Sequence, residues 1–462
     1  MMARIGDWAE AEAFLAAHPD VEAVDIVLTD ANGIGRGKII RRHEVEALYK
    51  QGRHLPSSIL GLDVTGEDVE ETGLVWSVGD ADLRAWPIAG TLVPLPWTSP
   101  RRAQVLVSLY HLDGHPHGAD PRHAMAAQID AMAADGRYPA GAFELEFYLL
   151  DAEPGPDGRP RPAAMALDGR RHGQVQVYGL DDLDGMQPFF GPVYQAAKAQ
   201  GLPLETLISE YAPGQYELTL HYRRDLLRAA DDLVMLKRLV RAMARRQGMV
   251  ACFMAKPFAA HAGSGMHLHV SLNDSQGNNL FAEDEGAVSP NPLLSHAIGG
   301  LAATMGDGML AFAPHANSWR RFVAKLYAPV QPTWGVNDRS VALRIPAGPV
   351  TARRVEHRPA GVDANPYLVG ATVLAGMRHG MAHAIDPGPA ADYQGFTQET
   401  PFARTMPGDW RAAIAQAQGS DFLKDALGAD LHRSFIAIKQ AELFRVAGCI
   451  PDTDYRLYLH QV

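Results

Sequence analysis

The most informative hydrophobic pattern lies between Phe143 and Leu150, where two glutamates interrupt an apolar run. Glu144 and Glu146 stand two positions apart, with Leu145 between them and phenylalanines on both sides. This period of two predicts a β-strand whose two carboxylates share one face, with Cα atoms about 7 Å apart. Two ionised carboxylates on a buried strand are unfavourable unless a divalent cation neutralises them. An exposed strand face with solvated acids is the alternative that this motif alone leaves open.

Apolar positions at helical spacing predict several helices in the rest of the chain. Residues 223–247 carry leucines and valines three or four positions apart, and Gly248 ends the pattern. Further helical patterns cover residues 7–17, 44–51, 121–135, 293–312, 366–385 and 431–447. Near the start of the chain, residues 21–28 and 35–40 form a predicted hairpin around a turn at residues 30–33.

These patterns divide the chain into two parts. A small unit of short strands and helices precedes residues 113–121, whose Gly, Pro, His and Asp residues are typical of a linker. The glutamate-bearing strand and the longer helices follow that segment. The sequence therefore predicts an α+β protein with a small N-terminal domain at residues 1–112 and a larger domain at residues 113–462.

Composition restricts the functions that this protein can have. The chain has 462 residues, of which 47% are hydrophobic and 21% are charged, as in a soluble globular protein. Its formal net charge of -11 argues against nucleic acid or an anionic membrane surface as a partner. Cys252 and Cys449 are the only cysteines, so we expect no disulfide framework. No signal-peptide pattern and no run of eighteen apolar residues occurs, so we expect a cytoplasmic location.

Four further segments also set polar side chains among apolar ones. They contain Glu210 and Glu217; His267, His269 and Ser271; Arg339 and Arg344; and Arg354, Glu356 and Arg358. Each segment alone is a weak signal, because histidines in strands are more often structural and arginine-rich runs are usually solvated. Together they predict a curved antiparallel sheet that lines a polar funnel. Carboxylates with an imidazole suit Mg²⁺ or Mn²⁺ better than Zn²⁺, and arginines suit a polyphosphate and a second anionic ligand.

The same segments resemble a known family. The matching segments are 143–147 (Phe-Glu-Leu-Glu-Phe), 213–217 (Pro-Gly-Gln-Tyr-Glu), 263–269 (Gly-Ser-Gly-Met-His-Leu-His), 317–321 (Asn-Ser-Trp-Arg-Arg), 337–346 (Asn-Asp-Arg-Ser-Val-Ala-Leu-Arg-Ile-Pro) and 354–358 (Arg-Val-Glu-His-Arg). In order and spacing they are similar to the signature segments of glutamine synthetase. With the hairpin near residue 30, the resemblance extends over nearly the whole chain.

The resemblance implies an architecture and a reaction. It implies a β-grasp N-terminal domain, a larger catalytic domain, and two stacked hexameric rings with each active site between adjacent subunits. The implied chemistry uses ATP and two to three Mg²⁺ or Mn²⁺ ions per site. The γ-carboxylate of glutamate attacks ATP to give γ-glutamyl phosphate, and an amine then displaces phosphate. The small-molecule substrates are therefore glutamate, ATP and an amine.

The resemblance also assigns roles to residues. One metal would be held by Glu146, Glu210 and Glu217, and the other by Glu144, His267 and Glu356. Glutamate would be bound by Arg321, Arg358 and the Gly263 backbone. The transferring phosphoryl group would be stabilised by His269, Arg339, Arg344 and Arg354, with Ser271 near the nucleotide and Arg344 and Arg354 also contributing to nucleotide binding.

The acceptor pocket departs from the ordinary family pattern. Ammonium-using members hold two acids there, whereas Leu55 and Tyr327 stand at the matching positions here. His261 precedes an alanine where an asparagine is usual, and Trp334 opens the segment before Asn337. An apolar, aromatic pocket of Leu55, His261, Tyr327 and Trp334 favours an alkylamine over ammonium. This pattern resembles the γ-glutamylpolyamine synthetase branch, whose members join glutamate to putrescine or related amines.

Other functions stay open at this point. The nearest alternative is an ordinary ammonium-using glutamine synthetase whose pocket acids lie elsewhere, since Asp63 and Asp68 are close to residue 55. An aromatic amine or an aminoalcohol is another conceivable acceptor. A catalytically inactive structural or regulatory member is the least favoured reading, because all six metal ligands are present.

Overall fold

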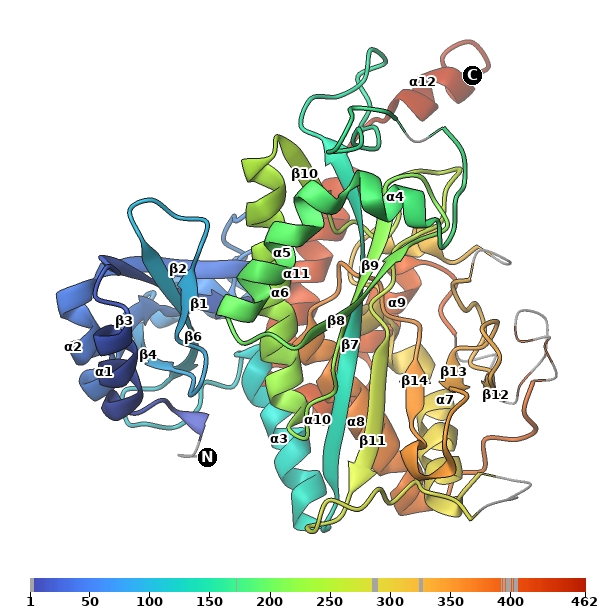
Figure 1. The fold of residues 1–462 in the computed structure, drawn as a ribbon. Helices are drawn as coiled ribbons and strands as arrows, with labels where there is room; N and C mark the ends of the chain where they lie inside the picture. The colour runs from blue at the N-terminus through green and yellow to red at the C-terminus, as the bar shows by residue number, and fades with distance from the viewer. Residues whose placement is uncertain are drawn as a thin grey trace.

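Two β-sheets of different size organise the chain, and helices cover them (Figure 1). The computed structural model describes residues 4–171, 173–284, 290–323, 327–391, 393, 395, 400, 402 and 406–462. The chain is a mixed α+β protein, as the sequence predicts, with most strands antiparallel. In Figure 1 the smaller sheet lies to one side of a larger body built from the second sheet and the long helices.

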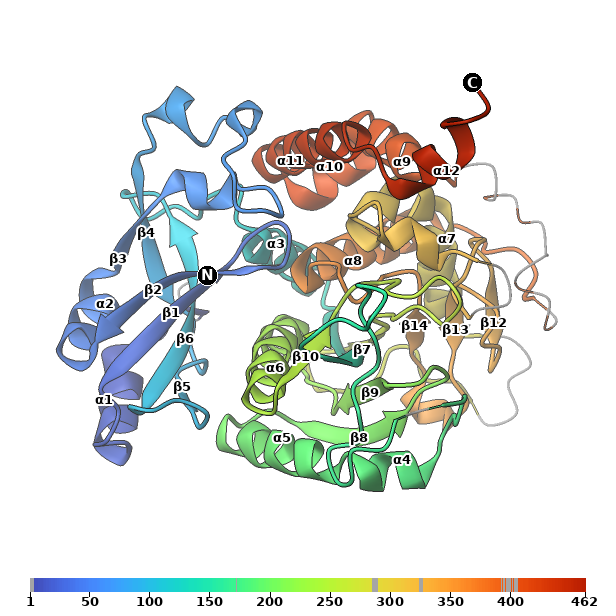
Figure 2. The same ribbon diagram turned by 90° about the horizontal axis from the view of Figure 1, so that it is seen from above.

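The smaller sheet belongs to the N-terminal part of the chain and has the order β2-β1-β6-β4-β3, with β5 paired to β6. Its strands are β1 (Ala23–Thr29), β2 (Gly35–Arg41), β3 (Arg53–Pro56), β4 (Asp82–Pro87), β5 (Val93–Leu95) and β6 (Arg102–Tyr110). Helices α1 (Trp8–Ala17) and α2 (Val45–Gln51) lie on the side away from the rest of the chain (Figure 2). Val24, Ile26 and Leu55 belong to its own hydrophobic core.

The larger sheet carries the predicted site and has the order β12-β13-β14-β11-β7-β9-β8, with β10 paired to β7. Its strands are β7 (Tyr138–Asp151), β8 (Leu204–Ser209), β9 (Gln215–Leu220), β10 (Met249–Cys252), β11 (Leu268–Asn273), β12 (Trp334–Val336), β13 (Leu343–Ile345) and β14 (Val355–His357). All of its neighbours pair antiparallel except β12 and β13. The predicted antiparallel sheet is therefore confirmed, with one parallel pair at its edge.

Helices line the back of this sheet and close the molecule. They are α3 (Pro121–Ala134), α4 (Leu180–Gly185), α5 (Gln187–Ala199), α6 (Leu226–Arg246), α7 (Pro292–Phe312), α8 (Pro366–His383), α9 (Trp410–Gln418), α10 (Asp421–Leu427), α11 (Ala429–Ala447) and α12 (Asp452–Tyr458). Helices α3 and α6 pack against β7, and α7 packs along α8. Their apolar faces form the larger hydrophobic core together with Phe143, Leu145 and Phe147.

The helices predicted from periodicity are confirmed to within a few residues at each end. The largest difference is at α6, which begins at Leu226 because the Asp225 side chain accepts hydrogen bonds from the backbone N–H groups of Leu227 and Arg228. None of the helices in the described part of the chain combines the length and the apolar run needed to cross a bilayer. The domain boundary near residue 112 stays a prediction; the smaller sheet ends at Tyr110 and the larger one begins at Tyr138.

Candidate active site

The two glutamates of β7 lie on one face of a buried strand. Glu144 and Glu146 are partly exposed, whereas Phe143, Leu145 and Phe147 are fully buried on the opposite face. The alternation seen in the sequence is therefore the alternation of the strand. Antiparallel pairing with β9 places Glu217 directly opposite Glu146. Two carboxylates at one cross-strand position repel each other, which is unfavourable without a compensating cation.

On the other side of β7, three strands bring a second set of polar groups to one level. The register of β11 with β14 pairs His269 with Glu356, and the register of β14 with β13 pairs Glu356 with Arg344. An imidazole, a carboxylate and a guanidinium therefore stand side by side across neighbouring strands. The side chains of paired residues project to the same face of a sheet. These three groups therefore lie on the face that also carries Glu144 and Glu146.

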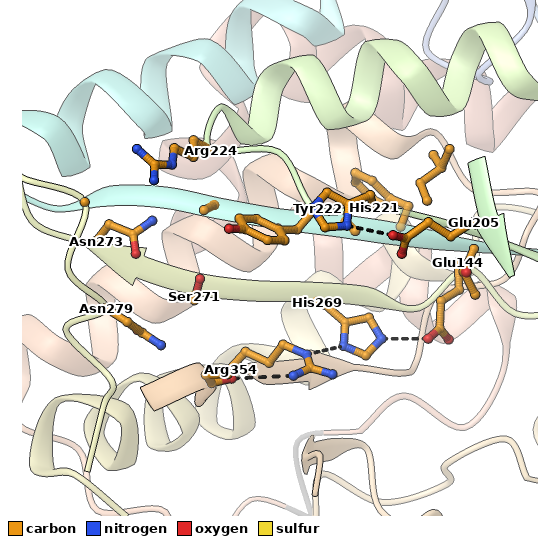
Figure 3. A pocket seen from close by; sticks show the side chains of 18 of the residues that line it. Glu144, Glu205, His221, Tyr222, Arg224, His269, Ser271, Asn273, Asn279 and Arg354 are labelled. Atoms are coloured by element: carbon orange, nitrogen blue, oxygen red, sulfur yellow. Dashed lines mark hydrogen bonds and ion pairs between the residues drawn. The ribbon is translucent and has the colours of Figure 1, made fainter. Parts of the chain in front are cut away.

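Glu144 is the centre of a hydrogen-bonded cluster. Its two carboxylate oxygens lie 2.8 Å from Nδ1 of His267 and 2.8 Å from Nε2 of His269. The Nε–H of Arg354 donates to Nδ1 of His269 at 3.2 Å, which continues the chain of contacts (Figure 3). Burial opposes ionisation of Glu144, yet the neighbouring His269 and His267 hold its pKa well below the ordinary value.

Glu356 is likewise held ionised. It is buried and lies 2.7 Å from Nη1 of Arg344, and it forms a second ion pair with Arg358. Burial works against its ionisation, but Arg358 and the two histidines lower the pKa of Glu356 to about 2. Glu144 and Glu356 thus remain anionic at neutral pH and are suited to hold a cation.

Glu210 and Glu217 differ from Glu144 and Glu356, because their pKa values are raised. Burial and the charge of Glu146 raise the pKa of Glu210 to about 7. Burial and the charges of Glu144 and Glu146 raise the pKa of Glu217 well above its ordinary value. Among the described residues neither Glu210 nor Glu217 forms an ion pair with a cationic side chain, so the carboxylates repel one another. A bound divalent cation would remove this repulsion, so the residues present fit a metal site of the Mg²⁺ or Mn²⁺ type.

This repulsion gives a pH prediction for the metal-free protein. The folded-state pKa of Glu210 is raised from 4.5 to about 7, so the folded state binds this proton more tightly than the unfolded state. Its contribution to stability is complete below the unfolded pKa and is lost as pH rises through about 7. Urea unfolding of chelator-treated protein across this window should show falling stability, and Glu210→Gln should reduce the fall. An identical pH dependence in parent and variant would contradict the assignment.

The structure gathers a slightly different set of metal-ligating atoms from the predicted one. Within the described residues, the one group of three whose ligand atoms all lie within 4.8 Å of one another is Glu144, His269 and Glu356. His267, predicted as the ligand in this set, is 2.8 Å from Glu144 and 3.9 Å from Glu356. Both histidines are thus within reach of the same acids. The choice between them stays a prediction.

Two glycines allow the backbone to approach the site closely. A Cβ atom at Gly265 would lie 2.6 Å from Nη2 of Arg321 and 2.9 Å from Nε2 of His267. A Cβ atom at Gly263 would lie 2.6 Å from the carbonyl of Ala255. The Gly265 N–H donates to Glu146 at 2.6 Å. Arg321 is buried, donates to the Pro359 carbonyl, and has its pKa lowered to about 10 by burial.

A cavity of about 530 Å³ opens beside Glu144 and His269 (Figure 3). Ser271 and Arg354 line it, and their role in nucleotide binding stays a prediction. Its lining also includes His221, Tyr222 and Arg224, which sequence reasoning missed. They follow the end of β9, so a polar and aromatic run directly after a glutamate-bearing strand was the signal that could have revealed them.

Two of the four predicted acceptor-pocket residues need correction. Leu55 is 0% exposed and packs in the core of the smaller sheet, so its side chain cannot line an open pocket. Trp334 is 8% exposed, belongs to the larger core, and donates its indole N–H to the Gly388 carbonyl. In both cases the residue type suited a pocket, but the strand face on which it lies is the buried one.

Tyr327 has an aromatic partner that the sequence did not suggest. Tyr327 is 52% exposed, and its ring lies 6.1 Å from that of Tyr211, which directly follows Glu210. The Tyr327 carbonyl accepts a hydrogen bond from Arg358 at 3.4 Å, which ties this residue to the Glu356 ion pairs. His261 is half-buried with its ring against Phe258. Two adjacent exposed tyrosines therefore form an aromatic surface next to Glu210.

Comparison with known proteins identifies the family. The model of the glutamine synthetase catalytic domain matches residues 118–458. The chain belongs to the glutamine synthetase family. The resemblance drawn from the sequence segments is therefore confirmed, and the mixed sheet with its acid-lined face is the catalytic domain of this family.

Individual relatives refine the comparison. The chain is 36% identical to gamma-glutamylputrescine synthetase PuuA of Escherichia coli K12, over 96% of this chain and 93% of the relative. It is 30% identical to a glutamate–isopropylamine ligase of a Pseudomonas species, over 81% of each chain. Among solved structures, the GmaS/ADP complex superimposes with a TM-score of 0.82 at 26% identity, covering 97% of this chain and 99% of that one.

Proposed function

We propose that this glutamine synthetase family member is an ATP-dependent ligase that joins the γ-carboxylate of L-glutamate to a primary amine. A γ-carboxylate oxygen attacks the γ-phosphorus of ATP and releases ADP, which gives γ-glutamyl phosphate. The amine nitrogen then attacks the carbonyl carbon, phosphate leaves, and the nitrogen loses a proton. Relatives named for putrescine and for isopropylamine as acceptors support this choice. The observation that carries it is the Tyr211–Tyr327 surface beside the acid cluster.

The acid cluster is proposed to hold two to three Mg²⁺ or Mn²⁺ ions. Glu144 and Glu356 with His267 or His269 form one ligand set, and Glu146, Glu210 and Glu217 form the other. When bound, the ions neutralise phosphate charge and orient the transferring group. Oxygen-rich ligand sets of this kind match hard divalent cations.

Basic side chains around the acids are proposed to handle the anionic substrates. Arg339 is exposed and lies close enough to Glu210 to lower its pKa, so it can reach a phosphoryl group beside the metals. Arg344, Arg354 and His269 stand along the cavity or its neighbouring strands. Arg321, Arg358 and the Gly263 backbone are proposed to bind glutamate, because two buried guanidinium groups match its carboxylates.

The acceptor is proposed to be an alkylamine, either a small monoamine or a diamine such as putrescine. An ammonium ion is small and strongly hydrated, so selecting it needs fixed negative charge rather than aromatic surface. The rings of Tyr211 and Tyr327 offer an alkylammonium group cation–π contact and cover its methylene groups. Each buried methylene contributes about 0.8 kcal/mol. The affinity for the amine should therefore increase with the length of its alkyl chain.

The acceptor assignment predicts a measurable preference. With glutamate and ATP fixed, ADP release should be compared for ammonium, ethylamine, putrescine, spermidine and ethanolamine. We expect kcat/KM to be at least about tenfold higher for the best mono- or diamine than for ammonium, equivalent to two buried methylenes. Tyr211→Ala should reduce this ratio, whereas Tyr211→Phe should preserve it. Ammonium as the best acceptor of the parent enzyme would return the protein to the ordinary glutamine synthetases.

The proposed assembly is a pair of stacked hexameric rings. Several large apolar side chains are exposed on the single chain, including Leu167, Tyr178 and Leu180 before and in α4 and Phe444 near the end of α11. We propose that another copy of the chain covers these side chains in the assembly. Light scattering should therefore give a mass of six or twelve chains, and Leu180→Asp should lower it. A stable, active monomer at working concentration would disprove the assembly. The predicted cytoplasmic location stays a prediction.

A further inference from the structure

A second large cavity lies between the smaller sheet and helix α6, which face each other in Figure 2. Its volume is about 770 Å³, and its lining shares no residue with the cavity beside Glu144. Helix α6 contributes Lys237, Arg238, Arg241 and Arg245, and the facing strands add further basic side chains. Among the described lining residues, Asp25 is the only carboxylate. The cavity is therefore strongly basic in a chain whose net charge is -11.

The one carboxylate is already shared by two arginines. Arg238 forms an ion pair with Asp25 and also donates to the Gln104 side chain at 2.5 Å. Arg102 approaches the other Asp25 oxygen at 3.2 Å. Asp25 is buried and close to Arg238 and Arg102, so these two arginines already neutralise its charge. Of the remaining α6 cations in the lining, Lys237 is buried, whereas Arg241 and Arg245 are exposed to solvent.

Lys237 is a buried cation of the cavity lining. It is 6% exposed, and its ammonium group donates to the Val362 carbonyl at 2.8 Å. Among the described residues no carboxylate forms an ion pair with Lys237, although Asp363 is near enough to favour its charged form. The ring of Phe253 lies 5.3 Å from the Lys237 nitrogen, and the Arg241 guanidinium lies 4.7 Å from the same ring. Burial, with Arg241 adding to it, lowers the pKa of Lys237 to about 7. A buried cation in this position is unfavourable without a counter-charge.

Arg241 and Arg245 complete the row one helical turn apart. In the part of the chain that the structure describes, neither makes an ion pair with a carboxylate or a hydrogen bond to another side chain. Both line the cavity from the same helix as Lys237. Residues four positions apart share one helix face, so the three cations converge on one region. Trp97 adds an aromatic surface to the lining.

We propose that this cavity binds a small metabolite carrying two or more oxyanion groups, held by Lys237, Arg241 and Arg245. Phosphate and carboxylate oxygens both form strong charge-assisted hydrogen bonds with such side chains. A cavity of this volume accommodates a ligand of metabolite size. The site lies where the smaller sheet meets α6. A bound ligand would therefore contact both the N-terminal part of the chain and the part that contains the larger sheet. The proposal does not depend on the proposed ligase function.

The test uses magnesium-free full-length protein, with pyrophosphate and citrate as separate probes. Each probe is expected to raise the thermal unfolding midpoint of the parent in a concentration-dependent manner. The double variant Arg241→Gln/Arg245→Gln should weaken the apparent affinity about tenfold or more, because two charge-assisted contacts are lost. Arg411→Gln removes an exposed arginine from α9 and serves as the matched control that keeps the parental response. A response to pyrophosphate alone identifies a phosphate ligand, and a response to citrate alone identifies a carboxylate ligand.

A second variant separates binding from structure. Lys237→Met replaces a buried, uncompensated cation with an apolar side chain of similar length. Without added anion it should raise the unfolding midpoint, and it should also weaken the response to the probe. A residue with a purely structural role would instead lower the midpoint and leave the probe response intact. An unchanged probe response in both the Lys237 variant and the double arginine variant would overturn the proposal.

Discussion

Glu217→Gln is expected to abolish ligase activity while making the metal-free protein more stable. Glu217 stands opposite Glu146 across β7 and β9, and burial together with the nearby carboxylates raises its pKa well above the ordinary value. The amide removes a charge that a divalent cation needs and the apoprotein tolerates poorly. We therefore expect turnover at background level, weaker Mg²⁺ or Mn²⁺ binding by calorimetry, and a higher urea midpoint in chelator.

The combination of these outcomes makes the test specific. A residue needed only for folding would lose activity and stability together. Glu71→Gln, which alters an exposed acid of the N-terminal part, should leave activity and metal binding at parental values. Near-parental turnover of the Glu217 variant, or a lower metal-free stability, would remove Glu217 from the metal site.

Arg339→Gln should reduce kcat about a hundredfold or more without unfolding the protein. A donor directed at charge that develops in the transition state contributes roughly 3–4 kcal/mol. Arg339 is exposed, so its loss leaves the core intact. It is a cleaner test than Arg344, because Arg344 lies 2.7 Å from buried Glu356 and its removal would also disturb that acid. Steady-state ADP release and circular dichroism measure the two quantities.

The matched control for this experiment is Arg320→Gln. Arg320 is also exposed and adjoins the glutamate-binding segment, but its guanidinium contacts the Ala316 carbonyl of its own turn. The same change of charge there should leave kcat close to the parental value. If the Arg339 variant also retained near-parental kcat, phosphoryl stabilisation would have to be assigned to other basic groups of the site.

The sequence by itself determined the elements that depend on local periodicity. The alternation around Glu144 and Glu146 defined a strand with a buried and a polar face, because successive side chains of any strand point to opposite sides. The spacing of leucines and valines located α6, and Asp225 caps it from within the same segment. The signature segments were sufficient to recognise the family, because their order along the chain is itself sequence information.

Tertiary structure decided every feature that depends on which segments meet. Glu146 and Glu217 repel each other only because β7 pairs with β9 in one register, and His269 reaches Glu144 only because β11 lies beside β7. The Tyr211–Tyr327 contact joins residues more than a hundred positions apart, and no local pattern predicts it.

The acceptor pocket is the clearest example of a feature that the sequence alone did not predict correctly. Leu55 and Trp334 have the chemistry of a pocket lining, yet both belong to short strands whose orientation is set by the sheets that they join. In so short a strand the pattern covers too few residues to separate the buried face from the open one, and a shift of one position reverses them. The basic cavity under α6 was invisible for the same reason. Its cations share a helix face in the sequence, but only the packing of α6 beside the smaller sheet encloses them in a cavity and brings Asp25 to Arg238.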